Sequence, residues 1–315
     1  MYNTPFDENY HSELDESDLC DVEGISKFKS LIGSANWIIT LGRFDIAYAV
    51  STLSRYSMAP CLGYFTAMER VFGYLRKHYA GHIVIDHQVA PIREKAQFNL
   101  GMDWIEFYPD ATEDLPYDMP HPAGSKAMLT CYVDADHARD KVTCRSVTGI
   151  ILLINNTPVL WISKRQKTVE TSTYGSELVA ARIAVDLLIE MRYKLRMLGI
   201  NVEDSSVLVG DNMAVVINTT LPSSALKKKH QACNYHRVRE AIAAKILIFG
   251  YIDTSTNLAD VCTKPLGATL FHGLLKQYMF RRPKFIGETV PKEELGPSQV
   301  HFASTVAKAL CNIAY

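Results

Sequence analysis

The sequence predicts an α/β fold in which a mixed five-stranded sheet is flanked by helices and preceded by a small helical domain. From Met128 onward, short apolar runs of strand character alternate with segments of helical spacing. Their expected order, β-β-β-α-β-α-α-β-α, is typical of a layered α/β domain. Before Met128, a segment dense in proline and aspartate separates these elements from an earlier stretch with helical periodicity.

The chain is expected to divide into five parts. These are a polar leader (1–22), a helical segment (23–82), a connector (83–127), the α/β domain (128–281) and a C-terminal tail (282–315). The main boundary is placed in the connector because long loops without secondary structure are uncommon inside one domain. The leader is acidic and is expected to be extended or disordered.

Within the α/β domain, three consecutive strands are predicted in MLTCYVD, VTGIILLI and TPVLWISK, with NNTP as a hairpin turn. Ser172 or Thr173 can cap a long helix that runs to about Leu198. A strand in SSVLVGDN, a short helix in MAVVINTT, a basic helix over residues 223–246 and a last strand in LIFGYID follow. A final helix is predicted to begin in STNLADVCTKPL and to continue through LFHGLLKQYMF.

Composition limits the classes of partner. The 315 residues carry a formal net charge of −1, so a nucleic acid would have to be bound by a local basic patch. The seven cysteines contain no Cys-x-x-Cys pair and are interpreted as reduced thiols of an intracellular protein. The N-terminal residues do not predict a targeting peptide, and the longest apolar runs are too short to cross a bilayer.

Four carboxylates occupy positions where a divalent cation could collect them. Asp134 ends a predicted strand, Glu177 lies near the start of the long helix, Asp211 directly follows a strand, and Asp260 lies where a loop becomes a helix. Carboxylate oxygens are fitting ligands for magnesium, so the four acids are predicted to form a two-metal site for phosphodiester hydrolysis. Taken singly, each acid could equally belong to a turn or a first helical turn. Asp136 is the main alternative to Asp134, since the two share a strand face.

Several motifs in one order carry a resemblance to a known family. YVDADHARD, RSVTG, WISKRQKTVETSTYGSELVA, VGDN, KKHQACNYHRVRE and LADVCTKPL resemble the ribonuclease H domain of Copia-type LTR retrotransposon polyproteins. FKSLIGSANWIITLGRFDIAYAVSTLSR and AMERVFGYLR are similar to the segment that closes the reverse transcriptase of these polyproteins. The chain contains no Asp-Asp pair, so the polymerase signature of such elements is absent, and His137 stands where the family has Trp.

The resemblance implies a ribonuclease H-like fold and a metal-dependent endonuclease that cuts the RNA strand of RNA/DNA hybrids. By position, Asp134 would bridge two Mg²⁺ ions, and Glu177 would hold the ion beside the leaving oxygen. Asp211 would complete that shared site, and Asp260 would hold the ion that activates water. Mn²⁺ is the alternative metal, and no organic cofactor is expected. The implied partners are the hybrid and the upstream part of a polyprotein, with no membrane. The expected compartment is the cytoplasm, with a virus-like particle or the nucleus as alternatives.

Two basic segments are candidates for contact with the nucleic-acid backbone. The first contains Lys164, Arg165 and Lys167; the second contains Lys228, Lys229 and His230, with His236, Arg237 and Arg239 beyond. Solvated surface charge is the alternative for both segments. His230 is also a candidate for proton transfer, because imidazole titrates near neutrality. Enzymes related to the resembled family place a histidine in a loop shortly before the last acid, whereas here the position ten residues before Asp260 is Gly250.

Two other functions stay open at this level. The chain could be a transposon remnant that folds or binds nucleic acid without using its catalytic residues. It could also be an integrase-like nuclease, although such enzymes place the glutamate after the second aspartate, and Glu177 lies between Asp134 and Asp211. The helical segment is expected to clamp the hybrid as a thumb-like module.

Overall fold

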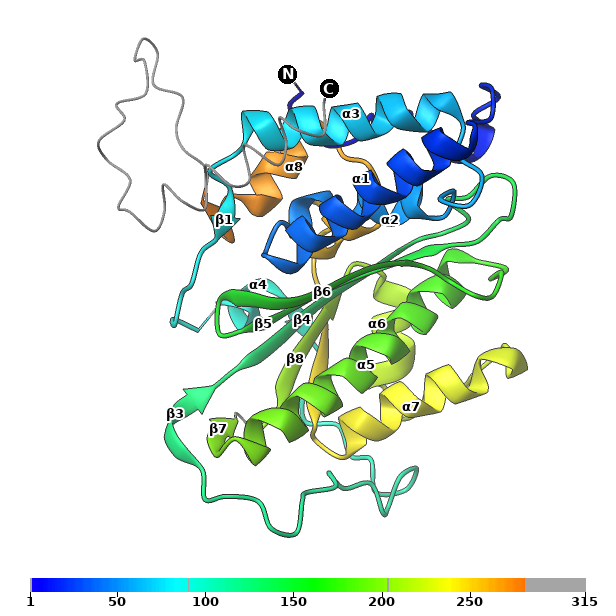
Figure 1. Ribbon diagram of the computed structural model, residues 1–315. Helices are drawn as coiled ribbons and strands as arrows, with labels where there is room; N and C mark the ends of the chain where they lie inside the picture. Colours follow the sequence, from blue (N-terminus) through cyan, green and yellow to red (C-terminus); the bar gives the residue numbers. More distant parts are fainter. Residues whose placement is uncertain (1, 90, 203, 281–315) are drawn as a thin grey trace. The chain divides into compact units, whose positions relative to one another are not determined.

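The computed structural model describes residues 2–89, 91–202 and 204–280 (Figure 1). The predicted tail, residues 282–315, lies outside this part of the chain. The described chain separates into two compact units, one formed by the residues up to His82 together with Met279 and Phe280, the other by Ile83–Tyr278. Two short strands, β1 (His82–Ile83) and β10 (Met279–Phe280), lie where the chain passes between the units.

The first unit is helical, as predicted for residues 23–82. It contains the 3-10 helices η1 (Ser12–Leu14) and η2 (Phe44–Ile46) and the helices α1 (Val22–Thr40), α2 (Ala47–Ser54) and α3 (Leu62–Lys77). The Asp21 carboxylate caps α1 by accepting a hydrogen bond from the Gly24 N–H at 2.8 Å. Arg43 and Tyr74 both donate to the Asp45 carboxylate, so this buried charge is satisfied.

The leader differs from the expectation of an extended or disordered segment. Phe6 is buried and packs edge-on against the rings of Tyr10 and Tyr48. The Tyr64 hydroxyl donates to the Ser12 carbonyl at 3.0 Å. Acidic composition suggested a solvated leader, but its few aromatic residues are enough to hold it on the helices.

The second unit contains a mixed six-stranded sheet. Its order is β2-β9-β8-β4-β5-β6, formed by Gln97–Phe98, Leu247–Tyr251, Ser206–Gly210, Leu129–Asp136, Val147–Ile154 and Thr157–Arg165. β4, β5 and β6 are antiparallel neighbours, whereas β8 and β9 run parallel to β4. The five predicted strands are all present, and β2 joins the edge from within the connector, antiparallel to β9.

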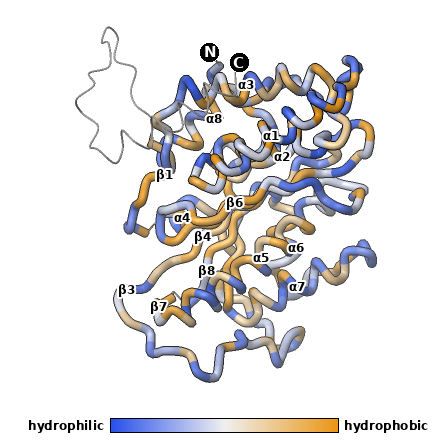
Figure 2. The backbone as a smooth tube through the Cα atoms, viewed as in Figure 1, coloured by the Kyte–Doolittle hydropathy of each residue, from blue (hydrophilic) through white to orange (hydrophobic). Residues whose placement is uncertain are grey.

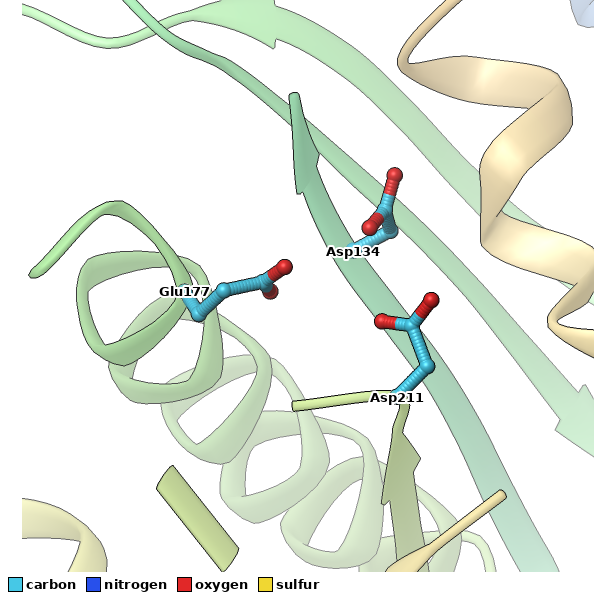
Figure 3. Close-up of side chains that lie close together, drawn as sticks. All are labelled: Asp134, Glu177 and Asp211. Atoms are coloured by element: carbon cyan, nitrogen blue, oxygen red, sulfur yellow. The ribbon is translucent and has the colours of Figure 1, made fainter. Parts of the chain in front are cut away.

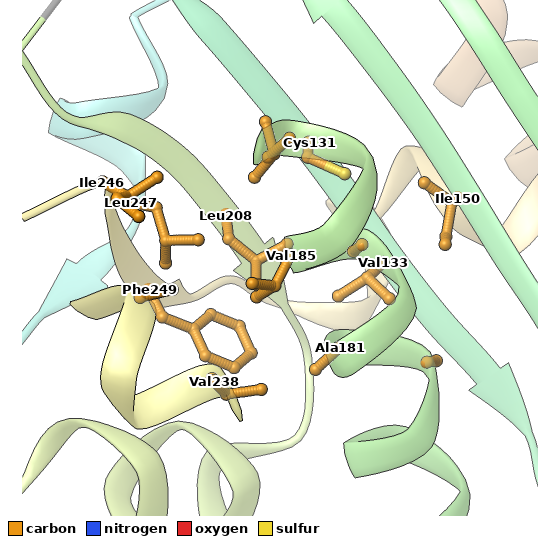
Figure 4. Packing of buried hydrophobic residues seen from close by; sticks show 14 of the residues in the cluster. Cys131, Val133, Ile150, Ala181, Val185, Leu208, Val238, Ile246, Leu247 and Phe249 are labelled. Atoms are coloured by element: carbon orange, nitrogen blue, oxygen red, sulfur yellow. The ribbon is translucent and has the colours of Figure 1, made fainter. Parts of the chain in front are cut away.

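Helices cover one face of this sheet (Figure 1). They are α5 (Thr173–Met197), α6 (Met213–Thr220) and α7 (Ala232–Ala243). Figure 4 shows the core between them and the sheet, where Val133 and Leu208 of the strands meet Val185 of α5 and Val238 of α7. Figure 2 shows the same distribution along the backbone, with apolar strands inside and a polar outer side on α7.

The other face of β4 and β5 is covered by η5 (Leu258–Cys262), a 3-10 helix whose residues are all buried. β4 is therefore buried on both faces as far as Ala135 and does not alternate between core and solvent. Burial on both faces is typical of strands with parallel neighbours. It explains why seven consecutive residues of β4, Leu129 to Ala135, are buried.

Two predicted helices are shorter in the structure. The basic helix expected over residues 223–246 reduces to a 3-10 turn, η3 (Lys229–Gln231), followed by α7. The helix expected to run from STNLADVCTKPL divides into η4 (Thr254–Thr256), η5 and α8 (Ala268–Leu275). Pro265 and Gly267 separate η5 from α8, and neither residue favours a continuous helix.

The connector belongs to the second unit and is packed against it. It supplies α4 (Ile92–Lys95), β2 and the strand β3 (Ala123–Ala127), which pairs with β7 (Ile200–Val202). Phe98 of β2 lies opposite Gly250 of β9, where an added Cβ would come within 2.4 Å of the Phe98 ring. Only glycine fits here, which accounts for Gly250 without a catalytic role.

Two arginines of the helices hold the rest of the connector. Arg192 of α5 is fully buried and binds both carboxylate oxygens of Glu113 at 2.7 and 2.8 Å. Arg239 of α7 is also buried, and its guanidinium lies 4.8 Å from the ring centre of Trp104 and 5.7 Å from that of Tyr108. Cation–π contacts and charge-assisted hydrogen bonds of this kind fix residues 104–113 in place. The connector is therefore packed against the second unit as a strap. The boundary between the two units, expected within the connector, lies at its first residue, Ile83.

Within the described residues, no helix is both apolar enough and long enough to span a bilayer.

Candidate metal centre

Three of the four predicted acids converge in the second unit. One carboxylate oxygen each from Asp134, Glu177 and Asp211 lies within 4.8 Å of the other two. Figure 3 shows Glu177 pointing from its helix toward Asp134 and Asp211 at the sheet. Residues separated by 77 positions in the sequence, from 134 to 211, thus form one acidic group.

The strand register brings the two aspartates together. β4 and β8 are parallel, and Tyr132 pairs with Val209, so each aspartate lies two residues beyond a paired position. Parallel strands deliver their carboxyl ends to the same edge of a sheet. α5 begins at this edge, with Ser172 capping its first turn by accepting from the Gly175 N–H, and carries Glu177 into the group.

The three acids line a cavity of ≈ 420 Å³. Its other lining residues are Ala135, Asp136, His137, Thr173, Asn212 and Lys264. Asp134 and Glu177 are 3% and 7% exposed, whereas Asp211 is half-buried. The centre is thus open on one side while two of its carboxylates are withdrawn from bulk water.

Burial and mutual repulsion alter the acidity of the group. Burial, followed by the charges on Asp134 and Asp211, raises the pKa of Glu177 well above its ordinary value. Burial and the charge on Asp134 likewise raise the pKa of Asp211. Carboxylates crowded in this way disfavour ionisation unless a positive charge joins them.

The donor set fits a hard divalent cation. Three carboxylates from three rigid elements offer oxygen ligands, which Mg²⁺, Mn²⁺ and Ca²⁺ prefer over nitrogen or sulfur. In the described part of the chain, no histidine or cysteine belongs to the group. A bound cation would also relieve the repulsion that raises the two pKa values.

The fourth predicted acid, Asp260, is not part of this group among the described residues. It is fully buried in η5, and the Lys264 Nζ lies 2.9 Å from its Oδ1. Burial and the charge on Asp134 raise the pKa of Asp260, and Lys264 opposes the shift. The structure therefore places Asp260 next to Asp134 and Lys264, but not among the residues that line the cavity.

Asp136, the alternative to Asp134, lines the cavity but lies outside the three-acid group of the described residues. Its Oδ2 is 3.7 Å from the Arg139 Nε. Asp134 and Asp136 both lie near the end of β4, but Asp134 is buried whereas Asp136 is partly exposed. Asp134 is also held by Thr263, whose hydroxyl donates to its Oδ2.

Besides Ala135 and Asp136, four lining residues were not predicted as site residues. Lys264 follows Asp260 by four positions, a spacing that favours an ion pair and could have indicated it. Asn212 caps α6 by accepting from the Val215 N–H at 3.2 Å. Thr173 is the first residue of α5. His137, which stands where the resembled family has Trp, also lines the cavity, and its Nδ1 lies 3.4 Å from the Ser176 hydroxyl.

The two predicted basic segments lie beside the start of α5. The Gln166 amide donates to the Ser176 carbonyl at 2.9 Å, which holds the segment with Lys164, Arg165 and Lys167 there. From the other segment, Lys228 donates to the Ser172 and Thr171 hydroxyls. Lys164, Lys167, Lys229 and His230 are exposed, whereas Arg165 pairs with Asp140 at 2.8 Å.

The basic residues of α7 do not form the expected contact surface. Arg239 is buried among aromatic rings and donates to the carbonyls of residues 218, 221 and 222. Arg237 pairs with Asp186 at 3.0 Å and with Glu240 at 3.3 Å. His236 lies 2.7 Å from the Tyr108 hydroxyl. Contacts with the connector account for His236 and Arg239, and ion pairs with α5 and within α7 account for Arg237.

Comparison with known proteins finds retrotransposon polyproteins among the relatives. The chain is 26% identical over 252 residues to the Retrovirus-related Pol polyprotein from transposon RE2 of Arabidopsis thaliana, covering 80% of this chain and 15% of that polyprotein. It is 27% identical over 249 residues to the polyprotein from transposon RE1 of the same plant, covering 78% and 14%. The chain thus spans about 15% of the length of the curated relatives it matches. No family model matches.

Among solved structures, the chain is similar to LC11-RNase H1 in complex with an RNA/DNA hybrid. The identity is 15%, the TM-score is 0.35, and the match covers 43% of this chain and 93% of that chain.

Proposed function

The chain is homologous to retrotransposon Pol polyproteins, and we propose that it is a Copia-type ribonuclease H that cuts the RNA strand of RNA/DNA hybrids. One observation carries this proposal. Asp134, Glu177 and Asp211 come from three separate motifs of the predicted domain and converge within 4.8 Å in the wall of one cavity. Carboxylates with raised pKa values in a cleft are candidates for a functional site.

Divalent ions, magnesium or manganese, would be held by these carboxylates. Such ions activate water as a nucleophile and stabilise the leaving oxygen of a phosphodiester. Asp134 is the central ligand, because both other acids face it and Thr263 fixes its second oxygen. Glu177 and Asp211 complete the site from α5 and from the end of β8, and Asp260 is the proposed fourth ligand.

Phosphate contacts are proposed for the basic residues beside α5. Lys164, Arg165 and Lys167 approach the start of α5 from β6, and Lys228, Lys229 and His230 approach it from η3. The helix N-terminus adds unpaired N–H groups that favour anions. A hybrid duplex is recognised mostly by shape and by its backbone, so contacts of this kind are sufficient for binding without base readout.

The order of the acids separates this proposal from an integrase-like nuclease. Glu177 lies on the helix between β6 and β8, before Asp211 in the sequence. The second alternative, a remnant that folds with unused catalytic residues, would have the same fold. The presence of Asp134, Glu177, Asp211 and Asp260 beside their motifs in one chain supports a working site instead.

Cleavage of a labelled hybrid tests the proposal. Wild type should cut the RNA strand only when Mg²⁺ or Mn²⁺ is present. Asp134→Asn and Asp211→Asn should each lower the cleavage rate by about 100-fold or more, since each removes a fixed counter-charge to the developing negative charge. Asp186→Asn is the matched control, because Asp186 is a partly exposed acid of α5 outside the cavity.

The outcomes separate the alternatives. Equal cleavage by wild type and both aspartate variants refutes the site. Cutting of duplex DNA in preference to the hybrid supports the integrase-like alternative. Binding of the hybrid by a folded wild-type protein that does not cleave it supports the remnant.

A further inference from the structure

Lys264 lies between the three-acid group and the fourth acid. Its Nζ is 2.9 Å from the Asp260 Oδ1 and 3.8 Å from the Asp134 Oδ2. Lys264 lines the cavity with Asp134, Glu177 and Asp211, whereas Asp260 does not line it. The lysine is thus the cationic side chain that the cavity presents to its acids.

The carboxylate of Asp260 is fully buried and lies close to that of Asp134. Both of its oxygens are buried, and in the described structure neither accepts a hydrogen bond. A buried carboxylate without hydrogen bonds is costly unless a charge partner is close. For Asp260 that partner is Lys264, because their atoms are within ion-pair distance.

The position of Lys264 is set by η5, which is fixed against the sheet. Asn257 caps η5 by accepting from the Ala259 N–H and donates to the Val133 carbonyl at 3.0 Å, beside Asp134. Gly149, paired with Asp134 across the strands, lets η5 approach, since a Cβ there would meet Thr263 at 2.5 Å and the Ala259 carbonyl at 2.7 Å. The ammonium is therefore delivered to this place by packed backbone.

We propose that Lys264 takes the place of the second divalent cation while the protein is free of nucleic acid. Its ammonium pairs with Asp260 and Asp134, the three-acid group alone binds one ion, and a second ion binds when Lys264 leaves Asp260. This inference rests on the proposed function and makes Lys264 a positioning residue of the same site. A primary ammonium suits the role, because it is a compact charge on a flexible stem that can withdraw.

Manganese binding to the full chain, measured by calorimetry without nucleic acid, tests the inference. Wild type is expected to bind one Mn²⁺ tightly. Lys264→Met should bind a second Mn²⁺, with the Kd of that site lowered by at least about tenfold, since a unit charge about 4 Å away acts directly on it. Lys264→Arg keeps the charge and should still bind one ion tightly.

A double variant identifies the acid that holds the second ion. Lys264→Met combined with Asp260→Asn should return to one tightly bound Mn²⁺, because the fourth carboxylate is lost. Lys264→Gln provides a second neutral variant should the methionine disturb η5, and circular dichroism confirms the fold of each protein. A merely structural lysine would change stability but not the number of ions.

The failures are distinguishable. Equal Mn²⁺ stoichiometry and Kd in wild type, Lys264→Met and Lys264→Gln overturn the role of Lys264 and leave the three-acid site intact. A second ion that persists in the double variant also overturns it. Asp134→Asn is expected to bind no Mn²⁺. If the wild type also binds none, the proposed function itself is contradicted.

Discussion

Glu177 is nearly enclosed by protein and faces two other carboxylates, so its negative charge is unfavourable in the absence of a cation. An uncharged amide of the same shape would avoid this cost. The residue therefore opposes the stability of the metal-free fold, as expected for a side chain kept for function and not for packing.

A pH series on Glu177→Gln should reveal this conflict. The pKa of Glu177 is higher in the folded protein than in the unfolded chain, so as pH rises the unfolded chain loses this proton at a lower pH than the folded protein does. Wild type therefore loses stability as pH rises from about 4.5 toward the pKa of Glu177 in the folded protein. In EDTA at pH 8 the variant should unfold at a higher temperature than wild type, and the difference should shrink toward pH 4. Thermal unfolding followed by circular dichroism measures it.

Glu190→Gln is the control for this series. Glu190 is an exposed residue of the same helix and pairs with Lys194 at 2.5 Å, so its change should have little effect on stability at any pH. A Glu177→Gln protein that is less stable than wild type at pH 8 in EDTA would contradict the electrostatic account.

The site residues differ in how far sequence reveals them. Asp134, Glu177 and Asp211 follow or begin regular elements within recognisable motifs, so their convergence could be predicted. The role of Arg239 could not, because its aromatic partners Trp104 and Tyr108 lie about 130 positions earlier. A charged residue in a basic run predicts a surface unless such distant partners are known.

At the scale of elements, the strap formed by the connector depends on a buried ion pair. Glu113 binds Arg192, which is fully buried, and also Arg196. Removing the charge of Glu113 would take away the carboxylate that both arginines bind, although the contacts of Arg192 to the Ser206 hydroxyl and the residue 204 carbonyl remain. The connector would then lose this attachment to α5.

Glu113→Gln should therefore lower the free energy of unfolding by about 3 kcal/mol, as is typical when one partner of a buried ion pair is removed. Urea unfolding at pH 7 measures this change. Asp186→Asn breaks a partly exposed pair on the same helix and should cost less than about 1 kcal/mol. Equal effects of the two changes would show that the strap does not stabilise the unit.

The elements also show where local patterns are insufficient. The long α5 was predicted with Ser172 or Thr173 as its cap, because capping and apolar spacing agree, and the structure has Ser172 in this position. β2 contains two residues and could not be recognised, since its pairing with β9 depends on the absence of a side chain at Gly250. The helix predicted over residues 223–246 was too long because basic residues before Ala232 favour a helix but are held by other contacts, such as Lys228 with Ser172.

At the scale of the molecule, five parts were expected, with the main boundary in the connector. The chain changes unit at His82 and again after Tyr278, so the second unit begins with the connector. A segment rich in proline and aspartate predicts a linker by composition, whereas Trp104, Tyr108 and Glu113 within it bind the helices. A thumb-like role for the helical unit stays a prediction.

The convergence of three acids on a cation is tested most directly by anomalous diffraction from a crystal of the protein soaked in MnCl₂. The account predicts a manganese peak within ligand distance of oxygens from Asp134, Glu177 and Asp211 at once. Manganese peaks confined to other surfaces, with these three carboxylates bound to no ion, would contradict it.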